Sequence, residues 1–162
     1  MQVECLWQGN MRFLAKTGEH QVFMDAKKPI GSQSAMTPKE LVLAGLAGCT
    51  AMDVAAYLRK HKQNASGLSV LSKTDLTNTF PSVFTEVELV YVVRGEVEAA
   101  ILMEAVQLSQ TKFCGVSAML SLSSPIRYRI ELNGARVGEG AASFQAKEAA
   151  VCTQTNPPSV PL

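Results

Sequence analysis

Two cysteines are the residues best suited to chemistry in this chain. Cys49 lies inside its most apolar segment, and Cys114 follows a predicted helix. A thiolate is a nucleophile that peroxides oxidise to a sulfenic acid, and a second thiol condenses with that acid to a disulfide. The alternative is that both are packing residues, because free cysteine is among the residue types most often buried. Residue type and position alone leave both interpretations open.

Other kinds of site have little support in the sequence. Cys5 alternates with polar neighbours in a predicted strand, and Cys152 lies in a segment without periodicity, so we expect neither to react. There is no C-x-x-C or H-E-x-x-H pattern, and His20 and His61 are far apart, so we expect no metal. The absence of G-x-G-x-x-G and Walker sequences predicts no nucleotide cofactor.

Composition narrows the classes of protein to which the chain can belong. Its 162 residues carry a formal charge of +1, which argues against partners such as nucleic acid or an anionic membrane surface. The longest mostly apolar run, residues 41–52, is shorter than the roughly 20 residues that span a bilayer. The N-terminus lacks the basic and apolar regions of a signal peptide. We therefore expect a cytoplasmic location, where thiols stay reduced.

The first half of the chain predicts short strands followed by a long helix. Alternation and Gly-containing turns over residues 1–25 are typical of a strand meander. Thr37-Pro38-Lys39-Glu40 then combines an N-cap, a proline at the first helical position and a capping box. The helix continues to about residues 59–62. Because its first half is apolar all round, we expect it to be buried on every side.

The second half predicts an α+β fold. Residues 67–76 and 83–93 are predicted strands of a hairpin, residues 96–112 and 116–122 predicted helices, and residues 126–132 a last strand before the Asn133-Gly134 turn. The order along the chain is βββ-α-ββ-αα-β. We assign residues 1–144 to one domain and residues 145–162 to a C-terminal tail.

Two blocks of sequence resemble a known family. The stretch TPKELVLAGLAGCTAMD, residues 37–53, and KFCGVS, residues 112–117, resemble the OsmC/Ohr family of osmotically inducible and organic hydroperoxide resistance proteins. The similarity extends over about residues 7–138 and is closest to the OsmC-like branch. It implies an OsmC-like fold in an intertwined homodimer, with a buried apolar central helix and two active sites at the subunit interface.

The resemblance also implies a reaction. Cys49 matches the peroxidatic position of a thiol peroxidase, and Cys114 matches the resolving one. The substrate implied is an organic hydroperoxide or hydrogen peroxide, and an external dithiol reductant completes the cycle without a cofactor.

The residues that activate the peroxidatic cysteine in the family are not plainly present. The family uses an Arg, oriented by a Glu that directly follows the helix-starting proline, whereas Lys39 occupies that position here. Glu40 is one residue later, about 100° around the helix, and is either an activating candidate or only a cap. Arg12 is the best candidate for the Arg, and residues 27–28 (Lys-Lys) lie where another branch places it.

Two functions therefore compete. The first is a two-cysteine peroxidase, favoured by retention of both cysteines. The second is a non-catalytic or redox-sensing OsmC-like protein that binds a small apolar ligand at the dimer interface, favoured by the missing Glu.

Overall fold

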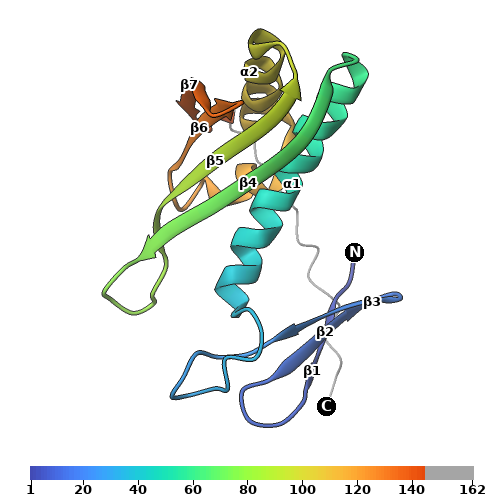
Figure 1. The fold of residues 1–162 in the computed structure, drawn as a ribbon. Coiled ribbons are helices and arrows are strands. Elements are labelled where there is room, and N and C mark those ends of the chain that lie inside the picture. The colour runs from blue at the N-terminus through green and yellow to red at the C-terminus, as the bar shows by residue number, and fades with distance from the viewer. Residues whose placement is uncertain (145–162) are drawn as a thin grey trace, which may run out of the picture.

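The computed structural model describes residues 1–144 and contains two separate β-sheets (Figure 1). The N-terminal sheet has antiparallel strands β1 (Glu4–Trp7), β2 (Phe13–Thr17) and β3 (His20–Met24) in that order. Gly9 and Asn10, between β1 and β2, both adopt positive φ, which a tight turn requires. This sheet confirms the predicted meander.

Helix α1 (Pro38–Lys60) leads from the N-terminal sheet into the rest of the molecule. The predicted capping box is present: the Glu40 N–H donates to Thr37 Oγ1 over 3.3 Å, and the Thr37 N–H donates to Glu40 Oε2 over 2.8 Å. These bonds satisfy N–H groups that a helix start leaves unpaired. The helix therefore begins where the sequence predicts.

The second sheet has four strands in the order β4 (Asn64–Leu76), β5 (Phe84–Glu96), β6 (Ile126–Leu132) and β7 (Ala135–Ala141). Strands β4 and β5 form the predicted hairpin, β5 and β6 are parallel, and β7 returns antiparallel to β6 after the Asn133-Gly134 turn. The sequence predicts β6 as the last strand. Strand β7 was missed because its sequence, ARVGEGA, contains two glycines and little apolar alternation.

The crossover between the parallel strands contains three helical segments. These are α2 (Ala99–Leu108), the π-helix η1 (Ser109–Phe113) and α3 (Gly115–Leu120). The sequence predicts one helix as far as residue 112, but the α-helical pattern ends at Leu108 and a π turn follows. The predicted interruption before the last helix is confirmed.

The core lies between the helices and one face of the second sheet. Every second residue of β5, beginning at Val87, faces inward, as the alternation of that strand predicts. Helix α1 contributes a stripe at four-residue spacing. The largest apolar contributors are Leu46, Val54, Leu58, Val87, Leu89, Val93, Leu102, Val106, Ile126 and Ile130.

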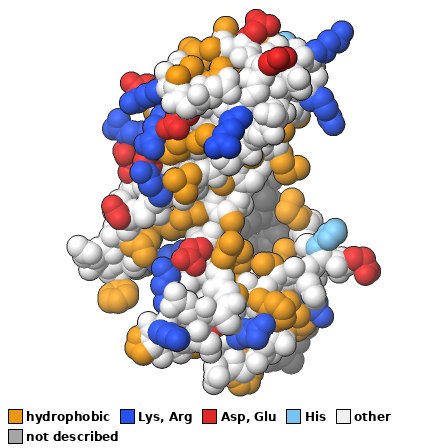
Figure 2. Space-filling view, in the orientation of Figure 1, with side chains coloured by type: hydrophobic (Ala, Val, Ile, Leu, Met, Phe, Trp, Pro, Cys, Tyr) orange, Lys and Arg blue, Asp and Glu red, His pale blue; other side chains and the backbone are white. Residues whose placement is uncertain are grey.

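One expectation about α1 is wrong for the single chain. The helix was expected to be buried on every side, but only its one stripe is, and Val42 and Met52 are 41% and 74% exposed. By length and composition α1 could cross a membrane, with a mean hydropathy of 1.7, yet only 22% of that apolar window is buried. Core helices of soluble proteins pass the same test. Apolar side chains are exposed on this face of the molecule (Figure 2), so the helix needs a cover that residues 1–144 do not supply.

Candidate redox site

Cys49 and Cys114, 65 positions apart in sequence, lie side by side in the fold. Cys49 is on α1 and is partly exposed, whereas Cys114 is fully buried at the junction of η1 and α3. Cys49 lies close enough to raise the pKa of the Cys114 thiol, and both thiols are free. The structure thus brings together the two cysteines that the sequence analysis selected. One is open to a reactant and the other is shielded behind it.

The surroundings of Cys114 hold it as a protonated thiol. Burial raises its pKa to about 11, and contact with the Cys49 thiol contributes to the rise. The Ser117 N–H opposes this effect by donating to Cys114 Sγ over 3.4 Å, a bond that also caps α3. The Cys114 N–H donates to the Ser109 carbonyl over 3.0 Å and closes the π turn. At neutral pH the buried thiol therefore keeps its proton.

A buried polar cluster that the sequence did not predict lies next to the cysteines. It comprises Thr50 and the half-buried Asp53 on α1, Tyr91 on β5, and Ser109 and Gln110 at the start of η1. Thr50 Oγ1 lies 2.6 Å from the Tyr91 hydroxyl and 2.7 Å from Ser109 Oγ. Burial raises the pKa of the Tyr91 phenol, so it stays protonated. A signal existed in the sequence, because Thr50 and Asp53 interrupt an otherwise apolar helix three residues apart.

The structure places Glu40 in the capping box instead of beside the cysteines. Its carboxylate accepts from the Thr37 N–H and forms an ion pair with Lys27 over 3.1 Å. Both contacts hold the pKa of Glu40 below its usual value, the Thr37 bond most strongly. Cys49 lies nine residues further along α1, about 13 Å at 1.5 Å per residue. Within its own chain, Glu40 serves as a cap.

Arg12 and Lys39 also lie apart from the cysteines within one chain. The Arg12 guanidinium lies 4.2 Å from the centroid of the Phe23 ring on the N-terminal sheet. Lys39 Nζ donates to the Ser82 carbonyl in the β4–β5 loop over 2.7 Å. Across residues 1–144, no ion pair or hydrogen bond connects a cation to Cys49. Residues 1–144 of a single chain therefore do not assemble the activating group.

Among residues 1–144, the other cysteine and the acidic residues form no further centre. Cys5 is exposed on β1, and Cys152 lies outside the described residues. Within residues 1–144, no group of three or more His, Cys, Asp or Glu side chains is placed to hold a metal ion.

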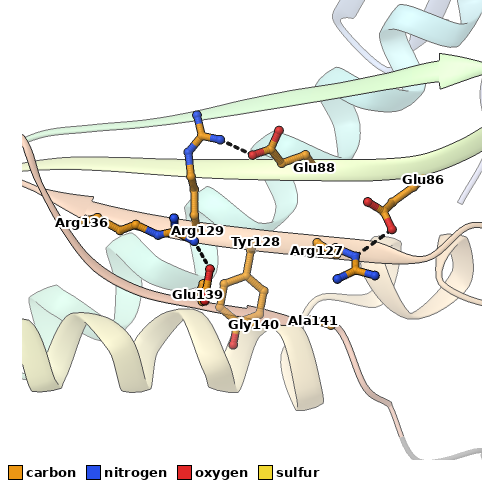
Figure 3. A pocket seen from close by; sticks show the side chains of 9 residues that line it. All are labelled: Glu86, Glu88, Arg127, Tyr128, Arg129, Arg136, Glu139, Gly140 and Ala141. Atoms are coloured by element: carbon orange, nitrogen blue, oxygen red, sulfur yellow. Dashed lines mark hydrogen bonds and ion pairs between the residues drawn. The ribbon is translucent and has the colours of Figure 1, made fainter.

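A hollow on the second sheet has charges that neutralise one another (Figure 3). Arg127 pairs with Glu86 over 2.8 Å, Arg129 pairs with Glu88, and the side chains of Arg136 and Glu139 also pair. Lys73 reaches Glu88 over 2.7 Å and contributes most to the lowered pKa of that carboxyl group. Since each charge shown already has a partner, this hollow offers no free charge to a ligand.

Comparisons with known proteins point to one family. A family described as OsmC-like protein matches residues 31–129, which include both cysteines and the whole buried polar cluster. Protein YhfA of Escherichia coli strain K12 is 31% identical over 134 residues, covering 82% of this chain and 98% of that protein.

Solved structures share the fold. A hypothetical protein from Aquifex aeolicus matches with a TM-score of 0.73 and 26% identity over 90% of this chain and 97% of its own. A putative organic hydroperoxide resistance protein from Vibrio cholerae, with captopril in one of its active sites, matches with a TM-score of 0.58 and 15% identity, covering 84% and 94% of the two chains. The second identity supports a common fold only.

Proposed function

The chain belongs to the OsmC-like protein family, and on that premise we propose that it is a thiol-dependent peroxidase that reduces organic hydroperoxides or hydrogen peroxide through Cys49 and Cys114. The observation that carries the proposal is that a partly exposed thiol lies close to a buried, protonated one. A pair used only for packing has no need of this asymmetry.

In the proposed first step, Cys49 attacks as the thiolate. Its sulfur attacks one oxygen of the peroxide, the O–O bond breaks, and the departing alkoxide takes a proton and leaves as an alcohol, or as water from hydrogen peroxide. Cys49 becomes a sulfenic acid. In the second step Cys114 sulfur attacks Cys49 sulfur, the S–O bond breaks, and the Cys114 proton leaves with the hydroxide as water. An external dithiol then reduces the disulfide.

The apolar surroundings of Cys49 favour organic hydroperoxides. A Cβ built at Gly45 or Gly48, on the same helix, would meet nothing within 4 Å among residues 1–144. Val42 and Met52 are exposed nearby along the helix. Small residues leave room for a substrate, and apolar neighbours suit an alkyl or aryl group.

A second copy of the chain is the proposed cover for α1. An apolar helix with glycines on its exposed side allows another backbone to approach closely. In such a homodimer, Arg12 of the partner subunit is the candidate cation for Cys49. Glu40, which the structure assigns to capping, is the weaker activating candidate. We place the dimer in the cytoplasm, where dithiol reductants are available.

One observation favours the alternative of a redox-sensing or ligand-binding protein. Lys39 replaces the family Glu and is directed to the β4–β5 loop. A sensor tolerates slow oxidation of Cys49, so it does not need an activating Arg–Glu pair.

Stopped-flow measurement of thiol loss with cumene hydroperoxide and with hydrogen peroxide tests the proposal. We expect rapid loss of two thiols per chain in the wild type, loss of one in Cys114→Ser, and no rapid loss in Cys49→Ser. Equal initial rates in the wild type and Cys49→Ser would exclude Cys49 as the attacking thiol. Oxidation at the slow rate of a free thiol in the wild type would favour the sensor.

A further inference from the structure

The two cysteine-bearing segments are connected by a short hydrogen-bonded path. Thr50 follows Cys49 on α1, and its hydroxyl lies 2.7 Å from Ser109 Oγ. The carbonyl of the same Ser109 accepts the N–H of Cys114 over 3.0 Å. Ser109 also donates to Asp53 Oδ2 over 2.9 Å. One serine therefore binds α1 with its side chain and Cys114 with its backbone.

The Asp53 carboxylate, which only accepts, and the Gln110 amide nitrogen, which only donates, determine the direction of every hydrogen bond in this path. Ser109 gives its only hydroxyl proton to the Asp53 carboxylate, so Thr50 donates to Ser109. Tyr91 must then donate to Thr50, and Gln110 Nε2 donates to Thr50 and Tyr91 over 3.0 Å each. Each hydroxyl has one defined orientation, which restrains the start of η1 against α1.

The cluster is not arranged for stability alone. Gln110 Oε1 is buried and has no hydrogen-bond partner among the described residues, which is costly in a protein interior. Apolar residues of similar size at Thr50, Tyr91 and Gln110 would fill the same space without that cost. A cluster that fixes geometry at the expense of stability suits a place where two reacting atoms must meet.

From this geometry we infer that Ser109, oriented by Thr50 and Asp53, is a positioning residue that holds Cys114 against Cys49 for disulfide formation. Tyr91 and Gln110 hydrogen-bond to Thr50 and so help to orient it. The inference rests on the proposed function, because disulfide formation is the second step of that reaction. Ser109 acts through the backbone of Cys114 and takes no part in the attack on peroxide.

Removing the path should separate the two steps of the reaction. In Ser109→Ala we expect sulfenic acid formation at Cys49, trapped with dimedone after one equivalent of cumene hydroperoxide, within about twofold of the wild-type rate. Disulfide formation should slow about tenfold, as expected for the loss of a buried hydrogen bond to a charged group. Ser121→Ala, whose hydroxyl bonds only within its own helix, is the matched control and should change neither rate.

Variants at Thr50 and Tyr91 show whether a slowed second step comes from loss of the path or from a folding defect. Thr50→Val, which keeps the side-chain shape, should repeat the slowed second step, and Thr50→Ser should restore it. Tyr91→Phe should show a smaller effect of the same kind. Tyr128→Phe, on the ring packed edge-on against Tyr91 at 6.2 Å, should show none. Wild-type rates of disulfide formation in both Ser109→Ala and Thr50→Val, or equal slowing of both steps, would overturn the inference.

A measurement without peroxide distinguishes this inference from the proposed function. Diamide oxidises two neighbouring thiols to a disulfide without a sulfenic acid. Slower diamide-driven Cys49–Cys114 disulfide formation in Ser109→Ala supports the positioning role even if the wild type proves unreactive towards hydroperoxides. Unchanged diamide rates would contradict it even if the peroxidase is confirmed.

Discussion

The two sheets of this molecule differ in how far the helices of residues 1–144 cover them. The β4–β7 sheet packs its inner face against α1, α2 and α3 and contains nearly all of the buried core. The N-terminal sheet buries only Leu14 and Ala15 among its apolar residues and leaves Trp7 67% exposed. Within residues 1–144 its strands make little contact with the helices or the other sheet. Among residues 1–144, the inner face of the β4–β7 sheet is covered by helices, whereas the N-terminal sheet has no such cover.

The residues of the proposed reaction are also divided between these two regions. Both cysteines and the cluster that aligns them lie in the region of the β4–β7 sheet and its helices. Arg12, the candidate activating cation, lies against the N-terminal sheet. If Arg12 reaches Cys49 only in a dimer, each chain contains its own pair of thiols, but the cation that activates the pair comes from the partner subunit.

The largest expected effect comes from Gly48→Leu. In one chain the added side chain meets open space and should improve helix propensity by about 1 kcal/mol. In a dimer packed along α1 it has no room, so we expect loss of both the dimer and the fold. Analytical ultracentrifugation and circular dichroism distinguish these outcomes, with Lys60→Leu at the exposed end of α1 as control. A wild-type protein that is folded as a monomer would show that neither sheet needs a second chain, and the difference drawn between them would disappear.

Arg12→Ala should slow the oxidation of Cys49 about tenfold or more, the effect of removing an opposite charge beside a thiolate. Arg12→Lys should retain part of the rate. Refolding Arg12→Ala together with Cys49→Ser sharpens the test, because a mixed dimer has one intact site only if Arg12 acts across the interface. Recovery of peroxide-dependent thiol loss in the mixture confirms action in trans, and no recovery contradicts it.

The buried thiol predicts a pH dependence that needs no second chain. The pKa of Cys114 is about 11 in the folded protein against an ordinary 9.0, so its contribution to stability is complete below pH 9 and is lost as the pH rises through 11. Between these values the wild type should lose about 1 to 3 kcal/mol more unfolding free energy than Cys114→Ser. Urea titrations at each pH measure this difference. Parallel curves would mean that the thiol is accessible to solvent.

The smallest effect is expected at the start of α1. Thr37→Ala removes the N-cap acceptor and should cost about 1 kcal/mol of unfolding free energy while leaving the cysteines in place. Thr79→Ala, in the β4–β5 loop, serves as control. A large loss of peroxidase activity in Thr37→Ala without a matching loss of stability would show that Glu40 does more than cap the helix.

Local signals in the sequence predicted the elements well where several agreed. The start of α1 followed from Thr37, Pro38 and Glu40 acting together, and the inward face of β5 followed from strict alternation. Strand β7 and the π turn were missed because their signals are weak or absent: glycines replace the apolar alternation, and nothing local indicates that hydrogen bonds will span five residues.

The candidate site was predictable only in part. Its cysteines stood out by residue type and by resemblance to a family. The cluster around Thr50 was not predicted, because it joins residues from α1, β5 and η1 that are up to 60 positions apart. Glu40 was placed correctly on the helix, but its pairing with Lys27 depends on the loop before α1, which has no periodic pattern.

The π turn lets the chain carry an extra residue without losing the alignment of the thiols. A π turn uses about one residue more per turn than an α-helix, and in η1 that extra residue lies between Ser109 and Cys114. Because the wider turn takes up the extra residue, the Cys114 N–H still reaches the Ser109 carbonyl. If the same residues formed an α-helix instead, everything beyond would be turned by about 100°, and Cys114 would face away from α1 with every reacting side chain still present. The redox pairing thus depends on a wide turn of the backbone as well as on the two cysteines.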